Sequence, residues 1–145
     1  MVLCWQDGKA LRPSHFRMRE FESGDGLVVI DPCLIQSLER VRYQLGARLG
    51  VEVEVIITSG TRTETENERL AARLGWVEHG GPVARDSRHL PKYGGIAVDL
   101  YVRYRRGDAW AVVPQAEVAD ACRQHFVFVK ADYEDGHVHA DNRKE

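Results

Sequence analysis

Apolar residues first recur at helical spacing between Asp31 and Gly50. They stand three or four positions apart, so one face of a helix carries all of them. These residues are Leu34, Leu38, Val41, Leu45 and Leu49. Asp31 is a suitable N-cap, Pro32 suits the first helical turn, and Gly50 suits the end of a helix. The pattern therefore predicts an amphipathic helix.

Four segments have the apolar pattern of strands. Residues 51–58 alternate between apolar and polar side chains and then become uniformly apolar, as a strand does where it enters a core. Residues 95–102 form a second segment of this kind. Residues 126–134 and 137–141 are the third and fourth, separated by the turn signal "DG" at 135–136. We expect a sheet whose last two strands form a hairpin.

Helices and loops fill the rest of the pattern. Two more helices are predicted, over residues 64–75 and 114–125, and a hairpin is expected around Gly107 and Asp108. Residues 76–95 are rich in glycine, proline and charge and have no period, which is typical of a long functional loop. This order lacks the strand–helix alternation of a doubly wound sheet. It favours an α+β fold with a mainly antiparallel sheet flanked by helices.

The composition is that of one globular domain spanning residues 1–145, with 43% apolar and 29% charged residues. A formal net charge of −2 gives no electrostatic reason to expect nucleic acid or an anionic membrane as a partner. The basic residues 103–107 are expected to form a solvated hairpin, and only residues 142–145 have the composition of a tail. With neither a secretory signal nor about 20 consecutive apolar residues, we expect a cytoplasmic protein without a membrane segment.

Three cysteines, Cys4, Cys33 and Cys122, are widely separated and show no Cys-x-x-Cys spacing. An odd number of this kind predicts neither a disulfide framework nor a thiolate zinc site. We expect two of them to be partly buried small apolar residues and one to lie near a mobile terminus.

Histidines and carboxylates gather in two of the predicted strands. Side chains two positions apart on a strand point the same way, so His137, His139 and Asp141 share one face. Asp99 is embedded in an apolar strand, where a charge is costly unless it is paired, hydrogen-bonded or bound to a metal. Without a metal, Asp99 would cap a turn and His89 would be its hydrogen-bond partner.

A catalytic zinc site usually has three protein ligands and a water molecule. His89, Asp99 and one histidine of the "HVH" pair supply this number without a thiolate. The ion lowers the pKa of the water to about 7, so that it can attack an amide carbonyl. Either Glu134 or His137 is available as the general base. Arg62, in the turn "TSGTR", is placed to hold a substrate carboxylate or an oxyanion.

The same residues, taken in chain order, resemble a known family. It comprises the zinc D-alanyl-D-alanine carboxypeptidases and endolysin L-alanyl-D-glutamate peptidases, which share the hedgehog/DD-peptidase fold. The family pattern is a strand ending in Ser-Gly-x-Arg, an Asn five positions later, Ser-x-His, Gly-x-Ala-x-Asp and a late His-x-His or His-x-Asp. This chain has "SGTR" at 59–62 with Asn67, "SRH" at 87–89, "GIAVD" at 95–99 and "HVHAD" at 137–141.

The resemblance implies a zinc ion held by His89, Asp99 and His139, and cleavage of a peptide bond in the peptidoglycan stem or cross-bridge. It also implies that Arg62 and Ser87 bind the substrate, with Arg62 acting on the transition state. In the family the first ligand and the Asp are seven positions apart, whereas here they are ten apart. We expect the additional residues to bulge outward while both ligands keep their places.

Two assignments of the last ligand are compatible with these motifs. If His137 is the ligand, Glu134 stands three positions before it, where the family has its base. If His139 is the ligand, His137 is the acid/base partner. The second assignment is favoured because Asp141 then completes the His-x-Asp form and is available as an outer-shell or strand-end contact.

The sequence thus suggests a monomeric zinc metallopeptidase, either a D,D-carboxypeptidase or an endolysin-type endopeptidase. It would be stored in the cytoplasm until a separate protein releases it to the cell wall. The alternative is a non-catalytic, zinc-containing module of the same fold that binds peptidoglycan or forms part of a phage particle. Turnover of purified cell walls, with a chelator as control, distinguishes the two.

Overall fold

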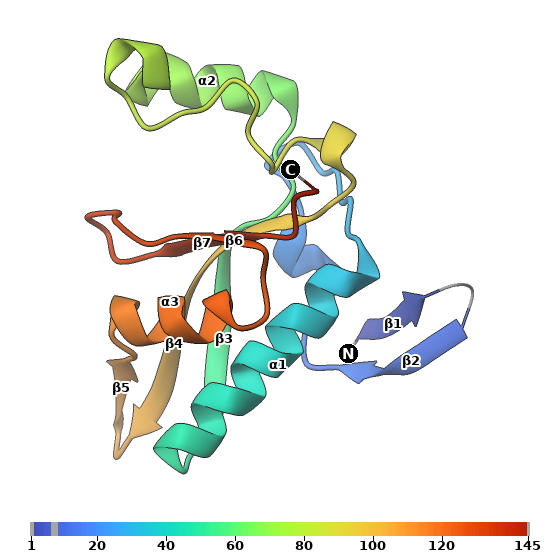
Figure 1. Cartoon of the computed structure of the whole chain (residues 1–145), viewed down its shortest axis with the longest axis vertical. Coiled ribbons are helices and arrows are strands. Elements are labelled where there is room, and N and C mark those ends of the chain that lie inside the picture. The colour runs from blue at the N-terminus through green and yellow to red at the C-terminus, as the bar shows by residue number, and fades with distance from the viewer. Residues whose placement is uncertain (1, 7–8, 145) are drawn as a thin grey trace.

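The protein has an α+β fold built on an antiparallel sheet. The computed structural model describes residues 2–6 and 9–144, with side chains from Ser14 onward (Figure 1). Five strands form the main sheet in the order β3-β4-β7-β6, and β5 pairs with the far half of β4. Their bounds are β3 Val53–Ser59, β4 Ala97–Arg106, β5 Ala109–Val112, β6 Phe128–Lys130 and β7 Val138–Asp141. The predicted fold class is confirmed at this level.

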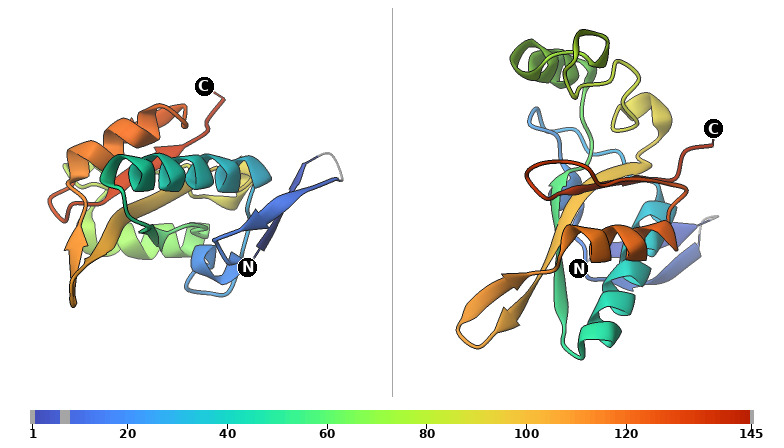
Figure 2. Two further views of the ribbon diagram at one scale, coloured as in Figure 1. Left: turned by 90° about the horizontal axis from the view of Figure 1, so that it is seen from below. Right: turned by 60° about the vertical axis from the view of Figure 1, so that its left-hand side comes forward.

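Two helices cover one face of the sheet, and a third lies beyond its end. Helices α1 (Pro32–Leu49) and α3 (Gln115–Arg123) pack side by side on this face, whereas α2 (Glu64–Leu74) stands apart from them (Figures 1 and 2). The core lies between α1, α3 and the sheet. Its most deeply buried side chains include Leu34, Leu38, Val41, Leu45, Val98, Leu100, Val102, Val118 and Cys122.

The helix boundaries follow from local chemistry. Asp31 caps α1 by accepting a hydrogen bond from the backbone N–H of Cys33, and Gly50 ends the helix with a φ of 71°. Thr63 caps α2 in a reciprocal capping box with Glu66. All three predicted helices are therefore confirmed, with ends that differ by two residues or fewer.

The predicted hairpin of the last two strands is wrong in its length. Strand β6 covers only residues 128–130, and residues 131–137 form a longer connection to β7. Asp135 accepts a hydrogen bond from the backbone N–H of His137, and Gln115 Nε2 donates to the carbonyls of Tyr133 and His137. These side chains form hydrogen bonds with backbone groups of residues 131–137. The connection therefore does not extend β6 as a longer strand.

Two further differences concern the chain before and after the site. An antiparallel pair, β1 (Val2–Gln6) and β2 (Lys9–Ser14), occupies a region for which no strand was predicted. Pro13, within β2, is unusual inside a strand and obscures the pattern. Strand β4 continues past residue 102 to Arg106, because β5 pairs with this extension in the expected hairpin.

The cysteine predictions are tested at two positions. Cys122 is fully buried, and burial raises the pKa of its thiol to about 12, so it behaves as a small apolar core residue. Cys33 is half-buried. The side chain of Cys4 lies outside the described part of the structure. In the described ranges, no helix combines the length and the apolar character that crossing a bilayer requires.

Candidate metal centre

Three side chains from distant parts of the chain meet where β4 and β7 pair. Asp99 on β4 and His139 on β7 are directly opposite each other in the antiparallel register. His89 reaches them from the long segment that follows α2, just before the short 3₁₀ helix Pro91–Tyr93. The residues between His89 and Asp99 are thus accommodated as a 3₁₀ turn, and both expected ligands lie at one place.

The three facing atoms form a compact triangle. His89 Nε2 lies 3.0 Å from Asp99 Oδ1 and 3.2 Å from His139 Nδ1, and His139 Nδ1 lies 2.9 Å from Asp99 Oδ1. All three residues are buried, with exposed fractions of 5%, 9% and 8% for His89, Asp99 and His139. In a tetrahedral zinc site with bonds of about 2 Å, ligand atoms lie about 3.3 Å apart. This group has the spacing needed to hold a metal ion.

The outer contacts of the two imidazoles fix which nitrogen carries the proton. His89 Nδ1 lies 2.7 Å from the carbonyl oxygen of Gly60, which can only accept a hydrogen bond, so Nδ1–H donates. His139 Nε2 lies 2.7 Å from Asp141 Oδ2 and donates for the same reason. In the neutral imidazoles, the inner nitrogens therefore present lone pairs.

Two lone pairs and a carboxylate oxygen consequently face one point. Such an arrangement is repulsive unless a cation, either a metal ion or an added proton, occupies it. Burial would raise the pKa of Asp99, but His89 and His139 outweigh it and hold this pKa well below its usual range. Burial opposes protonation of His139, yet its hydrogen bonds to Asp141 and Asp99 raise its pKa. The electrostatic environment of these three side chains therefore favours a cation at the point that they share.

Gly60 positions the first imidazole through its backbone. Its carbonyl holds His89, and the N–H of the next residue, Thr61, donates to the carbonyl of Phe21 at 2.9 Å. A Cβ atom added at Gly60 would lie 2.7 Å from Phe21 Cα and 2.8 Å from its carbonyl oxygen. The turn after β3 therefore needs a residue without a side chain.

We expect Gly60→Ala to lower both stability and metal affinity. The methyl group must push against backbone atoms, and overpacking of this kind costs about 1–3 kcal/mol. Displacement of the Gly60 carbonyl also releases His89 Nδ1. Denaturant midpoints and zinc titration measure the two effects. A variant with the parent's midpoint and affinity would contradict this view of the turn.

Arg62 and Ser87, the expected substrate-binding residues, lie beside the cluster of His89, Asp99 and His139. Arg62 Nη1 donates to Asn67 Oδ1 at 3.3 Å and to Ser87 Oγ at 3.5 Å. Its Nη2 lies 3.8 Å from Asp99 Oδ2. Burial lowers the pKa of the guanidinium, and Asp99 acts in the opposite sense. A cation is thereby held next to the three-residue cluster.

His137 lies at the edge of the cluster, outside the triangle of facing atoms. Its Nε2 is 3.8 Å from Asp99 Oδ2, while its Nδ1–H donates to Asp135 Oδ1 at 2.5 Å. The Tyr133 ring stacks on the imidazole, with ring centroids 3.9 Å apart. Burial, and then Asp99, raise the pKa of Tyr133 to about 12, so its phenol keeps its proton at neutral pH. The structure thus places His139, and not His137, in the cluster.

Glu134, the other base considered from the sequence, is exposed on the connection between β6 and β7. Asp135 and Tyr133 were not identified from the sequence, although both contact His137. A carboxylate two residues before a histidine was the available signal for Asp135. Nothing in the spacing indicated the stacking of Tyr133.

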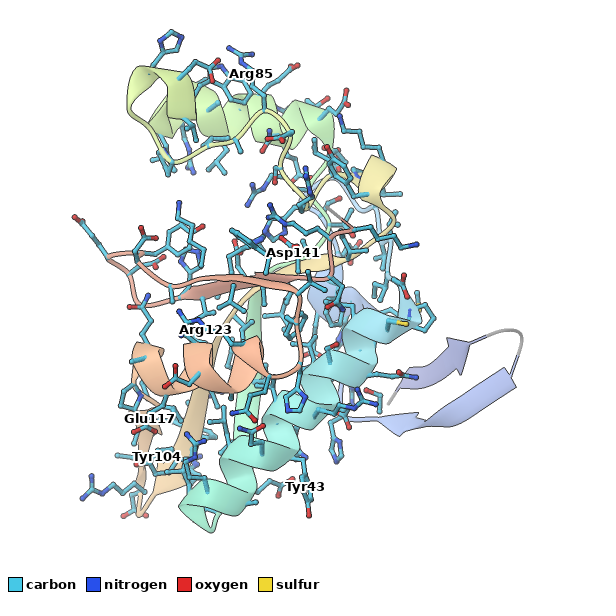
Figure 3. All side chains as sticks on the ribbon, in the orientation of Figure 1. Tyr43, Arg85, Tyr104, Glu117, Arg123 and Asp141 are labelled. Carbon is cyan, nitrogen blue, oxygen red and sulfur yellow. The ribbon has the colours of Figure 1, made fainter. Side chains whose placement is uncertain are left out.

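The cluster opens into a cleft of about 780 Å³, which Glu134 and His137 also line. One wall is apolar and comes from α2 and the segment after it: Leu70, Leu74, Val77, Pro82 and Val83. The opposite wall is largely polar and includes Lys130, Asp132, Tyr133 and Asp135. In Figure 3 this region lies between the labelled Arg85 and Asp141. The cleft therefore has the volume to admit a small ligand next to the cluster.

The chain is similar over part of its length to two curated proteins. A stretch of 90 residues, 62% of the chain, is 31% identical to the o-succinylbenzoate synthases of Salmonella paratyphi B and Salmonella dublin. The match spans 27% of the length of those enzymes. No family model and no solved structure matches. Similarity to about a quarter of an enzyme does not carry its activity to this chain, because activity resides in the residues of a specific site.

Proposed function

We propose that this protein is a zinc-dependent peptidase of bacterial peptidoglycan with a hedgehog/DD-peptidase-like fold. The observation that supports it best is the convergence of His89, Asp99 and His139 on one buried point at the floor of a cleft. The ordered motifs around Arg62 and Ser87 point in the same direction, because their side chains also line this cleft.

The donor atoms suit zinc. Two imidazole nitrogens and one carboxylate oxygen are typical zinc ligands, whereas calcium and magnesium prefer sites made of oxygen alone. His89, Asp99 and His139 would hold the ion, and all three residues line the cleft. Zinc held by them would supply a Lewis acid and a water of lowered pKa.

Arg62 and His137 have distinct roles in this proposal. The Arg62 guanidinium is fixed by Asn67 and Ser87 and binds the substrate carbonyl or carboxylate, stabilising negative charge as it develops. Because His137 Nδ1–H donates to Asp135, Nε2 is the nitrogen that accepts a proton from water and later gives it to the leaving amine. Glu134 lines the same cleft and is the alternative base.

The substrate is a peptide of the peptidoglycan stem or cross-bridge. A cleft with one apolar and one polar wall suits a short peptide that carries small apolar side chains and charged groups. We further propose that the protein works as a monomer, is held in the cytoplasm, and meets its substrate only after release. Neither nucleic acid nor membrane is expected as a partner.

Hydrolysis of purified cell walls tests the proposal. We expect zinc-loaded protein to release new amino groups from washed walls, a chelator to stop the release, and added zinc to restore it. Mass spectrometry of the products identifies the bond. Tight binding to walls without any product would contradict the peptidase and support a non-catalytic wall-binding module.

A further inference from the structure

The segment after β7 is folded tightly against the metal centre. Asp141, the last residue of β7, has a side chain with 0% exposure. Its Oδ2 accepts hydrogen bonds from His139 Nε2 at 2.7 Å and from Arg143 Nη2 at 2.7 Å. Its Oδ1 accepts from the backbone N–H of Arg143 at 3.0 Å and from Arg143 Nε at 2.8 Å. Among the described residues, this buried carboxylate is hydrogen-bonded to His139 and Arg143.

Arg143 also supports His139 from a second direction. Its guanidinium carbon lies 3.7 Å from the centre of the Phe128 ring. Phe128 in turn meets the His139 imidazole edge-on, with ring centroids 6.0 Å apart and an interplanar angle of 66°. One half-buried arginine thus contacts both groups that border the His139 ring, the carboxylate at its edge and the phenyl ring beside it.

We propose that Arg143 and Asp141 form a clasp that positions His139 as a metal ligand. Arg143 holds the Asp141 carboxylate with two parallel N–H donors, and Asp141 holds the His139 ring with Nδ1 facing His89 and Asp99. Arginine suits this role because its planar fork matches a carboxylate at both oxygens. Both residues act through His139 and are positioning residues. The inference rests on the metal site of the proposed function.

The clasp gives the C-terminal residues a direct effect on metal affinity. Outer partners of metal-bound histidines are worth about 10–100-fold in affinity. Without the Arg143 side chain, the Asp141 carboxylate still accepts a hydrogen bond from His139. It loses the two guanidinium donors that fix the plane of the carboxylate. The imidazole then loses the orientation in which its lone pair meets the ion.

Zinc affinity of an Arg143→Ala variant tests this inference, measured by competition with a chromophoric chelator. Arg143 is the primary site because its side chain is 27% exposed, whereas replacing the buried Asp141 alters the core. We expect Arg143→Ala to bind zinc about tenfold more weakly and its cobalt-loaded form to show a changed visible spectrum. Arg143→Lys, which keeps the charge and loses the fork, should recover only part of the affinity.

Arg103→Ala is the matched control. Arg103 donates Nε and Nη2 to Glu54 at 3.1 and 3.0 Å and lies 4.0 Å over the Trp110 ring, away from the metal centre. The Arg103→Ala variant should lose about as much thermal stability as Arg143→Ala and keep the parent's zinc affinity. Parent-like affinity in Arg143→Ala, full recovery with Arg143→Lys, or an equal loss in Arg103→Ala would overturn the clasp. Because zinc binding is measured without substrate, a parent that binds zinc but cleaves no peptide would fail only the proposed function.

Discussion

Replacing either imidazole ligand should abolish stoichiometric metal binding. We expect His89→Ala and His139→Ala each to weaken zinc binding by more than about 100-fold, because each removes one of three protein ligands rather than an outer partner. Each change also removes one of the two histidines that are hydrogen-bonded to the buried Asp99. Metal analysis after gel filtration, together with competition titration, measures the loss.

His15→Ala is the control for these two variants. His15 pairs with Glu39 at 2.8 Å, is exposed, and lies outside the cluster. It should retain about one zinc per chain, as we expect for the parent. Retention of zinc by His139→Ala together with its loss in His137→Ala would reverse the choice of ligand. It would also make Glu134 the base.

The second large effect concerns turnover without loss of metal. We expect His137→Ala to lower kcat by about 10²–10⁴-fold while zinc stays bound, because the variant removes an acid/base group that the triangle of ligands does not include. Arg62→Ala should lower kcat/KM by about 10²–10³-fold for the same substrate, through loss of charge stabilisation. Steady-state kinetics on the identified wall peptide and metal analysis of the same samples provide the measurement.

His79→Ala serves as the matched histidine control, since His79 is exposed on the 3₁₀ helix Val77–His79. Its kcat should equal that of the parent. If His137→Ala keeps full activity and Glu134→Gln loses it, the roles proposed for these two residues must be exchanged. If His137→Ala and Glu134→Gln are both inactive and both lose zinc, the assignment of the base to a residue outside the metal ligands is wrong.

The strongest sequence signals came from positions where one residue type is physically required. Helix α1 was predictable because Asp31, Pro32 and Gly50 mark its ends and a single apolar stripe joins them. Asp99 was informative because an acid inside an apolar strand demands a partner. These features depend on residues close in sequence, which is why a pattern reveals them.

Other parts of the site depend on contacts that no spacing encodes. The group that fixes the His89 tautomer is the backbone carbonyl of Gly60, and any residue has a carbonyl. Arg143 belongs to residues 142–145, which have the composition of a tail. The structure, and not the sequence pattern, shows that Arg143 contacts Asp141 and Phe128. Tertiary contacts of this kind follow from strand pairing, which the sequence pattern leaves undetermined.

The shortened β6 has a similar origin. Residues 126–134 contain enough apolar side chains for a longer strand, but hydrogen bonds from Gln115 on α3 hold the connection in another course. That course brings Tyr133 and Asp135 against His137. The deviation from the predicted hairpin is therefore what assembles the polar wall of the cleft.

A crystal structure of the protein grown with zinc tests whether His89, Asp99 and His139 hold a metal ion. We expect one anomalous-scattering peak within about 2.2 Å of three atoms, His89 Nε2, Asp99 Oδ1 and His139 Nδ1. Asp141 and Gly60 should retain their hydrogen bonds to the outer nitrogens. A zinc ion bound by other residues, or imidazoles that turn away from one another in this crystal, would contradict the assignment of these three ligands.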